Sequence, residues 1–245
     1  IRTKDFDWNI SLNLAHNENE VTRLSNDVFT MDKILLGDVF IRGGSSSGTH
    51  VLEEGRPIGQ FYGLVCNGID ENGRYILVDK DGDGEISDPA DYDYIGSAQP
   101  KLTYGITNTF RYKNFDLSFF LRGTIGNDIL NATRMAYAQS GFLPGTNALD
   151  DPLTYTLSET PRFSNYYLEK GSFMRLDNLT LGYKIKALNG IRVYFTAQNL
   201  FVITKYKGLD PEVPMDSGDG LTPGVEPREF YPKARTFSVG LNLNF

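Results

Sequence analysis

Two ten-residue stretches of strict alternation between apolar and polar residues constrain this chain more than any other feature. Residues 5–14 place Phe6, Trp8, Ile10 and their alternate neighbours on one face and only polar residues on the other. Residues 236–245 repeat the pattern. A period of two predicts a β-strand with two unlike faces. About ten residues is also the length at which a tilted strand crosses the hydrocarbon layer of a membrane.

The polar faces of these stretches are unusually small and weakly charged. They carry mostly Asn, Ser, Thr and Gly, which suit the water-filled interior of a large barrel better than the outer face of a soluble sandwich. Soluble sandwiches also alternate, so that fold stays open at this point. A net charge of −7 without a basic stripe argues against nucleic-acid binding. We therefore expect an all-β fold.

Further strands are expected in pairs. Short turns at Lys113-Asn114 and at 188–190 are expected within hairpins, whereas the connections on the opposite edge are long. This asymmetry is typical of an outer-membrane barrel whose long loops face the outside. The expected strands are 5–14, 51–65, 103–112, 115–122, 172–183, 191–202 and 236–245, and the expected extracellular loops are 67–102, 126–171 and 205–235.

The count of strands decides what the chain can be. About seven or eight antiparallel strands of a large transmembrane barrel cannot close by themselves, because both sheet edges would lie unpaired in lipid. We therefore expect a fragment of a larger barrel. In this arrangement residues 17–50 lie on the periplasmic side, where a further hairpin around 29–41 would account for their length.

Aromatic residues cluster near the expected strand ends, and two residues break the alternation within the expected strands. An aromatic girdle at the membrane interface is the first interpretation of the cluster, and stacking of loop aromatics on sugar is the second. The alternation breaks at Asn108, a polar residue among apolar ones, and at Phe120. The cluster comprises Tyr104, Tyr112, Phe115, Phe201, Tyr206 and Phe245.

An Asp-rich segment is the sharpest local motif. Its spacing of oxygen-bearing side chains, with Gly84 at the sixth position, matches the start of a calcium-binding loop. The twelfth position holds Ala90 in place of a bidentate Glu, so that Asp88 or Asp91 must supply the missing carboxylate. A solvated Asp/Gly turn is the alternative. The expected ligands of a structural Ca²⁺ are Asp79, Asp81, Asp83, Glu85 and Asp88.

Nothing in the sequence predicts catalysis. Cys66 lacks a nucleophile motif, adjacent acidic pairs do not make a glycosidase site, and the Gly-rich stretch at 43–48 lacks the Lys-Ser/Thr ending of a phosphate-binding loop. We expect no catalytic residues and no organic cofactor.

Several segments, in order and over nearly the whole chain, resemble the C-terminal barrel of the SusC/RagA family of TonB-dependent importers. They include Tyr104-Gly105 and Lys113-Asn-Phe-Asp-Leu-Ser118. The other matching segments and residues are 54–63, 81–84, 94–100, Asn108, Phe110, 170–183, 198–201, 206–212 and 231–245.

This resemblance implies a barrel of about 22 strands in the outer membrane of a Gram-negative cell. It also implies that residues 1–245 are the C-terminal part of that one barrel domain, without its plug domain and N-terminal strands. It implies import of oligosaccharide or oligopeptide, powered through TonB, together with a SusD-like surface lipoprotein. TonB would be contacted by a part of the protein that is not in this chain. Two alternatives stay open: a TonB-dependent siderophore or vitamin receptor, and a soluble calcium-stabilised β-domain that binds carbohydrate.

Overall fold

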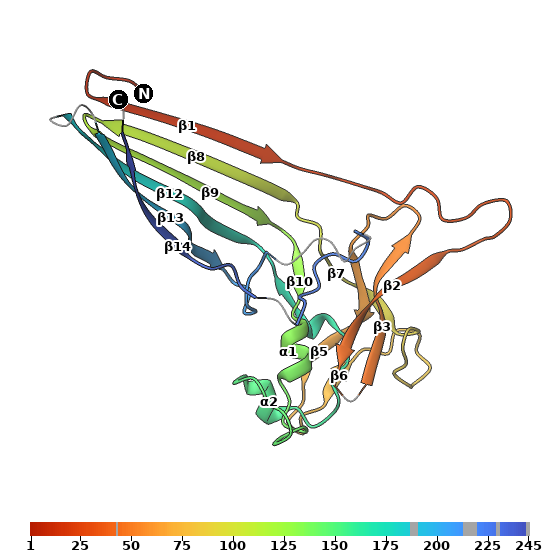
Figure 1. The fold of residues 1–245 in the computed structure, drawn as a ribbon. Helices are drawn as coiled ribbons and strands as arrows, with labels where there is room; N and C mark the ends of the chain where they lie inside the picture. The colour runs from red at the N-terminus through yellow and green to blue at the C-terminus, as the bar shows by residue number, and fades with distance from the viewer. Residues whose placement is uncertain (43, 187–190, 213–219, 229–230, 244–245) are drawn as a thin grey trace.

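A six-stranded antiparallel sheet forms one end of the molecule in the computed structural model, which describes residues 1–42, 44–186, 191–212, 220–228 and 231–243 (Figure 1). The strands lie side by side in the order β1-β8-β9-β12-β13-β14. Their bounds are β1 Phe6–Ala15, β8 Leu102–Tyr112, β9 Phe115–Ile125, β12 Phe173–Ile185, β13 Ile191–Thr204 and β14 Thr236–Asn242.

The strand register aligns like residues across all six strands. Because paired residues point to the same face of a sheet, each row of partners shows which face is apolar. One row is apolar throughout: Trp8, Phe110, Leu117, Leu181, Phe195 and Val239. The adjacent row on the other face is small and polar throughout: Asn9, Thr109, Ser118, Thr180, Thr196 and Ser238.

Within the described residues, no protein layer covers the apolar face. Ile10, Leu12 and Val239 are 61%, 56% and 76% exposed, whereas a soluble sandwich would bury this face against a second sheet. The predicted facing of residues 5–14 and 236–243 is therefore confirmed. Residues 244–245 lie outside the described residues.

The polar exception on the apolar face has a specific partner. Asn108 is 7% exposed, and its Oδ1 accepts a hydrogen bond of 3.1 Å from the indole Nε1 of Trp8 on the neighbouring strand. Because this amide oxygen has a hydrogen-bond donor, Asn108 does not leave an unpaired acceptor on the apolar face.

The expected strand at 51–65 is wrong. The chain turns between Glu53 and Gln60, with Gly55 and Gly59 in left-handed conformations, and divides the segment into β3 Gly44–Glu53 and β4 Gln60–Leu64. Both belong to a separate sheet of order β2-β3-β4-β7. The described large sheet accordingly has six strands and not seven or eight.

A globular domain, residues 33–97 together with 128–170, packs at the end of the sheet opposite the Lys113-Asn114 turn (Figure 1). Its core combines both segments, with Phe61, Leu64, Leu130 and Met135 all fully buried. Its remaining elements are β2 Lys33–Ile41, β5 Cys66–Ile69, β6 Tyr75–Leu77, β7 Tyr92–Ser97, β10 Asp128–Leu130, α1 Ala132–Tyr137, α2 Pro152–Thr156, η1 Asn165–Tyr167 and β11 Leu168–Lys170. None of the described helices has the length and hydropathy of a membrane-spanning helix.

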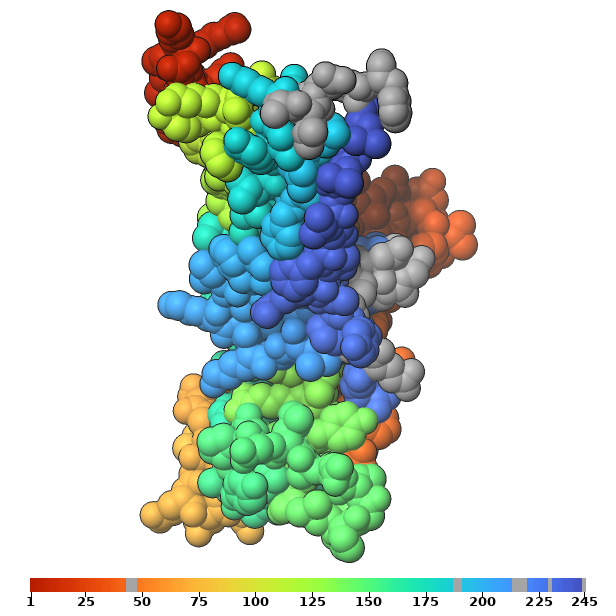
Figure 2. All heavy atoms as spheres, turned by 60° about the vertical axis from the view of Figure 1, so that its left-hand side comes forward, coloured from red at the N-terminus to blue at the C-terminus, as the bar shows by residue number. Residues whose placement is uncertain are grey.

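Residues 16–101 form one continuous excursion between the neighbouring strands β1 and β8. The expected periplasmic placement of residues 17–50 is wrong, because β1 ends beside the start of β8, at the end of the sheet with the long connections. The expected hairpin is present there as β2 and β3, in the globular domain. Figure 2 shows the resulting elongated shape, with the green segment of the globular domain at its base.

A short turn lies at the other end of the sheet. Tyr112 pairs with Phe115 across Lys113-Asn114, with Lys113 in the left-handed conformation that such a two-residue turn uses. The predicted turn at 188–190 lies outside the described residues. Tyr112 and Phe115 are 52% and 51% exposed, as the predicted girdle requires, but Tyr206 is buried in the third long connection and does not belong to a girdle.

Candidate functional site

A pocket of about 600 Å³ lies at the end of the large sheet that carries the long connections. Strands β1, β8 and β9 form its floor with residues of the polar face, and segments 98–100 and 211–212 form its walls. Residues of the polar face and its connections in the lining include Asn13, Thr103, Gly105, Phe120, Arg122 and Asn127. The third long connection thus folds back over the polar face and encloses space there.

Arg122 joins this connection to the sheet. Its guanidinium donates two hydrogen bonds to the Glu212 carboxylate, at 2.6 and 3.0 Å, and a third to Asp177 Oδ1 at 3.0 Å. Arg122 lies in β9 and Asp177 in the neighbouring strand β12, at an irregularity of the register between Leu176 and Asn178. Bidentate pairing fixes both the position and the orientation of the Glu212 side chain.

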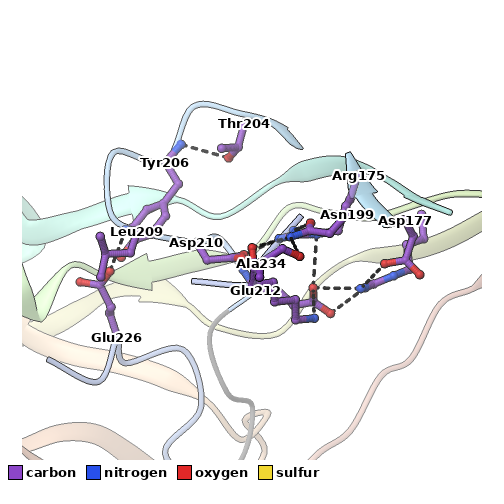
Figure 3. A network of polar contacts seen from close by, with 12 residues as sticks. Arg175, Asp177, Asn199, Thr204, Tyr206, Leu209, Asp210, Glu212, Glu226 and Ala234 are labelled. Carbon is purple, nitrogen blue, oxygen red and sulfur yellow. Dashed lines mark hydrogen bonds and ion pairs between the residues drawn. The ribbon is translucent and has the colours of Figure 1, made fainter. Parts of the chain in front are cut away.

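Arg175 makes a second, more deeply buried contact beside the first (Figure 3). It is 1% exposed, and its Nη2 lies 2.5 Å from Asp210 Oδ1. Its Nη1 also donates to the Asn199 side chain, whose amide donates to the backbone oxygen of Lys233 at 2.6 Å. The network therefore ties both ends of the connection to strands β12 and β13.

Charges in this network balance. Arg122, Arg175 and Lys233 face Asp177, Asp210 and Glu212, so each cation has a carboxylate partner. Burial alone would raise the pKa of Glu212, but hydrogen bonds from Arg122 and Lys233 outweigh it and hold that pKa below its ordinary value. The network adds no net charge to the pocket wall.

The same connection also contacts the globular domain. Glu226 is 1% exposed, and its backbone N–H donates a hydrogen bond of 3.0 Å to the carbonyl oxygen of Leu130 in β10. The imidazole Nε2 of His50, which is fully buried in β3, lies 2.9 Å from the Pro223 carbonyl oxygen. Residues 206–212 and 220–226 thus link the sheet to the globular domain.

The acidic segment forms an exposed loop between β6 and β7. Carboxylate oxygens of Asp79, Asp81 and Asp91 lie within 4.8 Å of one another. Asp91 is buried, and hydrogen bonds from the backbone N–H groups of Ser87 and Lys80 lower its pKa. Three carboxylates at this separation suit a hard cation such as Ca²⁺.

The other expected ligands have different partners in this structure. Asp88 forms an ion pair of 2.7 Å with Arg162. Asp83 Oδ1 accepts a hydrogen bond from the backbone N–H of Glu85 at 2.8 Å, and the Glu85 side chain is outside the group of converging carboxylates. The cluster therefore joins two expected ligands to Asp91.

Sequence reasoning assigned no role to Arg122, Arg175, Asp210 or Glu212, although three of them lie in segments that carry the family resemblance. The sequence carried one signal for this network: two arginines within the expected strands. Arg122 and Arg175 lie side by side on the polar face of the sheet, and such charges predict nearby carboxylates. Glu212 lies 90 residues after Arg122 in the sequence, so local spacing could not predict which carboxylate pairs with Arg122.

Comparison with models of known protein families gave no match. The whole chain matches the TonB-dependent receptor SusC of Bacteroides thetaiotaomicron at 36% identity, and this match spans 25% of the receptor. It also matches the TonB-dependent receptor P3 of Formosa agariphila at 32% identity over 100% of the chain and 27% of the receptor. The chain thus spans about a quarter of the length of these relatives.

Solved structures show the same likeness in three dimensions. The RagAB peptide transporter superposes with a TM-score of 0.74 and 25% identity, covering 98% of this chain and 27% of the transporter chain. A structure of the RagAB peptide importer in its "open-open" state gives a TM-score of 0.71. The expected fold class, strands of a large antiparallel barrel that do not close by themselves, is confirmed.

Proposed function

Because the chain belongs to the SusC/RagA family of TonB-dependent receptors, we propose that it supplies C-terminal strands to the wall of a nutrient importer in the outer membrane of a Gram-negative cell. The importer takes up oligosaccharides or oligopeptides. The chain itself contributes wall, pocket and connections, and performs no covalent chemistry.

One observation carries this proposal: the large sheet has an uncovered apolar face, and its opposite face carries a row of small polar residues that runs across all six strands. Acyl chains cover such an apolar face at no cost in hydrogen bonds, and water fills the polar side. The proposed orientation follows from the turns, since short turns of outer-membrane barrels are periplasmic and long connections extracellular.

Two partners follow from the proposed orientation. The globular domain and the connection at 205–235 lie on the extracellular side, where a SusD-like lipoprotein docks and cargo arrives. TonB engages a part of the protein that is not in this chain and transmits the energy of the inner-membrane proton gradient. The RagAB structures, described as a peptide transporter and importer, support the assignment to import.

A structural Ca²⁺ in the acidic loop belongs to the same proposal. Asp79, Asp81 and Asp91 would hold the ion, and the ion would stiffen the connection between β6 and β7. At a hundredfold excess of ion over its dissociation constant, binding to the folded state alone stabilises it by about 2.7 kcal/mol. We expect Ca²⁺ but not Mg²⁺ to raise the melting temperature of the complete protein, and Asp79→Asn to abolish the increase. Equal melting with and without Ca²⁺ would remove the ion from the proposal.

The import function is tested in cells that carry the complete protein, with cells lacking it as the control. Uptake of isotope-labelled neutral oligosaccharides and of oligopeptides is measured with and without an uncoupler of the proton gradient. We expect energy-dependent uptake of one of the two cargo classes and co-purification of a surface lipoprotein. Uptake of neither class, with loss of iron-siderophore uptake in the deletion strain, would favour the siderophore receptor.

A further inference from the structure

Phe120 is an aromatic residue on the polar face of the large sheet, as are Tyr194 and Phe173. Its row runs Ser11, Thr107, Phe120, Asn178 and Gln198. The ring extends over Gly105 on the neighbouring strand: a Cβ built on that glycine would lie 3.1 Å from Phe120 Cε2. The absence of a side chain at position 105 lets the ring lie against the strand backbone, and Phe120 is only partly buried.

The ring lines the same pocket as a set of neutral polar groups. Asn13, Gln99 and Asn127 present side-chain amides to it, and within the described part of the chain the amides of Asn13 and Gln99 have no hydrogen-bond partner. Each amide offers both donors and acceptors. The pocket thus combines an aromatic ring with amides that are free to bind hydroxyl groups.

The charged residues that line the pocket are paired with each other. Its two charged lining residues, Arg122 and Glu212, are bonded to each other, and Asp177 accepts the remaining Arg122 contact. A charged ligand would have to break these bonds or stay without a counter-ion, and both are unfavourable in a partly enclosed site.

We propose that this pocket is a binding subsite for a neutral oligosaccharide, with the apolar face of one hexose stacked on the Phe120 ring and its hydroxyl groups bonded to Asn13 and Gln99. The C–H groups on a pyranose face carry slight positive charge and are attracted to the negative face of an aromatic ring. The subsite rests on the proposed import function and deepens it by choosing glycan over peptide, since an oligopeptide carries charged termini that this pocket does not pair.

The alternative, purely structural role of Phe120 is to cover the backbone at Gly105, as aromatic side chains do beside strand glycines. Phe120→Leu separates the two roles, because leucine still covers Gly105 but has no aromatic face. Phe119→Leu is the matched control, since Phe119 is the adjacent residue on the apolar face and stacks on Phe110.

The experiment measures binding of neutral hexasaccharides of glucose, mannose and fructose, and of a hexapeptide mixture, to the complete purified protein by calorimetry. We expect Phe120→Leu to lower the affinity for the bound hexasaccharide by about tenfold with an unchanged melting temperature. Phe120→Trp should retain binding, because tryptophan offers a larger aromatic face. Phe119→Leu should leave the affinity unchanged.

Three results would overturn the subsite: unchanged hexasaccharide affinity in Phe120→Leu, an equal loss in Phe119→Leu, or a hexapeptide affinity that falls with Phe120 while no hexasaccharide binds. Failure of the import function is a separate result. Hexasaccharide binding that depends on Phe120 in a protein that transports nothing would leave the subsite standing and refute the importer.

Discussion

The large sheet and the globular domain handle their apolar residues in opposite ways. In the globular domain Phe61 and Met135 are fully buried in a core built from two segments of the chain. In the sheet Val239 is 76% exposed and Ile10 is 61% exposed, with no protein over them. The comparison shows two ways of removing apolar side chains from water. The globular domain buries them in its own core, whereas the sheet exposes them on a face suited to contact with lipid.

The largest expected effect is in the globular domain. Phe61→Ala should destabilise that domain by about 3 to 5 kcal/mol, because it opens a cavity in a closed core. Hydrogen exchange on the complete protein in bilayers measures it: protection should fall in peptides from 33–97 and stay in peptides from 102–125. An equal loss in both regions would show that the two regions unfold as one unit.

A charge on the apolar face tests the sheet. Val239→Arg near the middle of the bilayer should cost about 2 to 4 kcal/mol in folding into lipid vesicles, while Ser238→Arg, the next residue and on the polar face, should cost much less. Folding titrations with denaturant on the complete protein give both values. Similar costs would contradict the assigned facing of β14.

The third effect concerns the polar exception on the apolar face. Trp8→Phe should destabilise the folded barrel by about 1 to 3 kcal/mol, because it leaves the buried Asn108 amide without its donor. Adding Asn108→Leu to this variant should recover much of the loss, since no polar group then remains unpaired. If the double variant is as unstable as the single one, the hydrogen bond is not the reason for Asn108.

The smallest effect is a pH dependence where the two regions meet. The pKa of Glu212 is lowered in the folded protein, so its ionised form stabilises the fold above its ordinary pKa, and this contribution disappears as the pH falls through the lowered pKa, below about pH 4. Exchange in peptides from 206–212 should increase in that range. In Glu212→Gln the same peptides should exchange faster already at neutral pH and respond less to acid.

The sequence predicted the sheet well and the globular domain poorly, for a physical reason. Lipid on one side and water on the other favour alternation in the strands of the sheet, so residues 5–14 and 236–243 could be assigned from their pattern alone. In the globular domain β4, β5, β6, β7, β10 and β11 have only three to six residues each, and Gly55 and Gly59 break the segment 51–65 where an unbroken strand had been expected.

The candidate site was predictable only in parts. Phe120 was visible as a break in the alternation, but its position over Gly105 depends on the register of β8 and β9. The pairing of Arg175 with Asp210 joins residues 35 apart through a connection whose path no local pattern specifies. In the acidic loop, spacing found Asp79 and Asp81, while the fold of the loop brings Asp91 to them.

The open edges of the large sheet have a consequence for anyone who produces these residues alone. Within the described residues, β1 pairs with β8 and β14 with β13, and residues 1–3 bond the start of the other edge of β1, so the rest of each outer edge displays a row of backbone donors and acceptors. Such rows recruit other strands indiscriminately. A recombinant piece with this sequence should therefore accumulate as inclusion bodies, and biophysical work should begin from the whole receptor refolded in detergent.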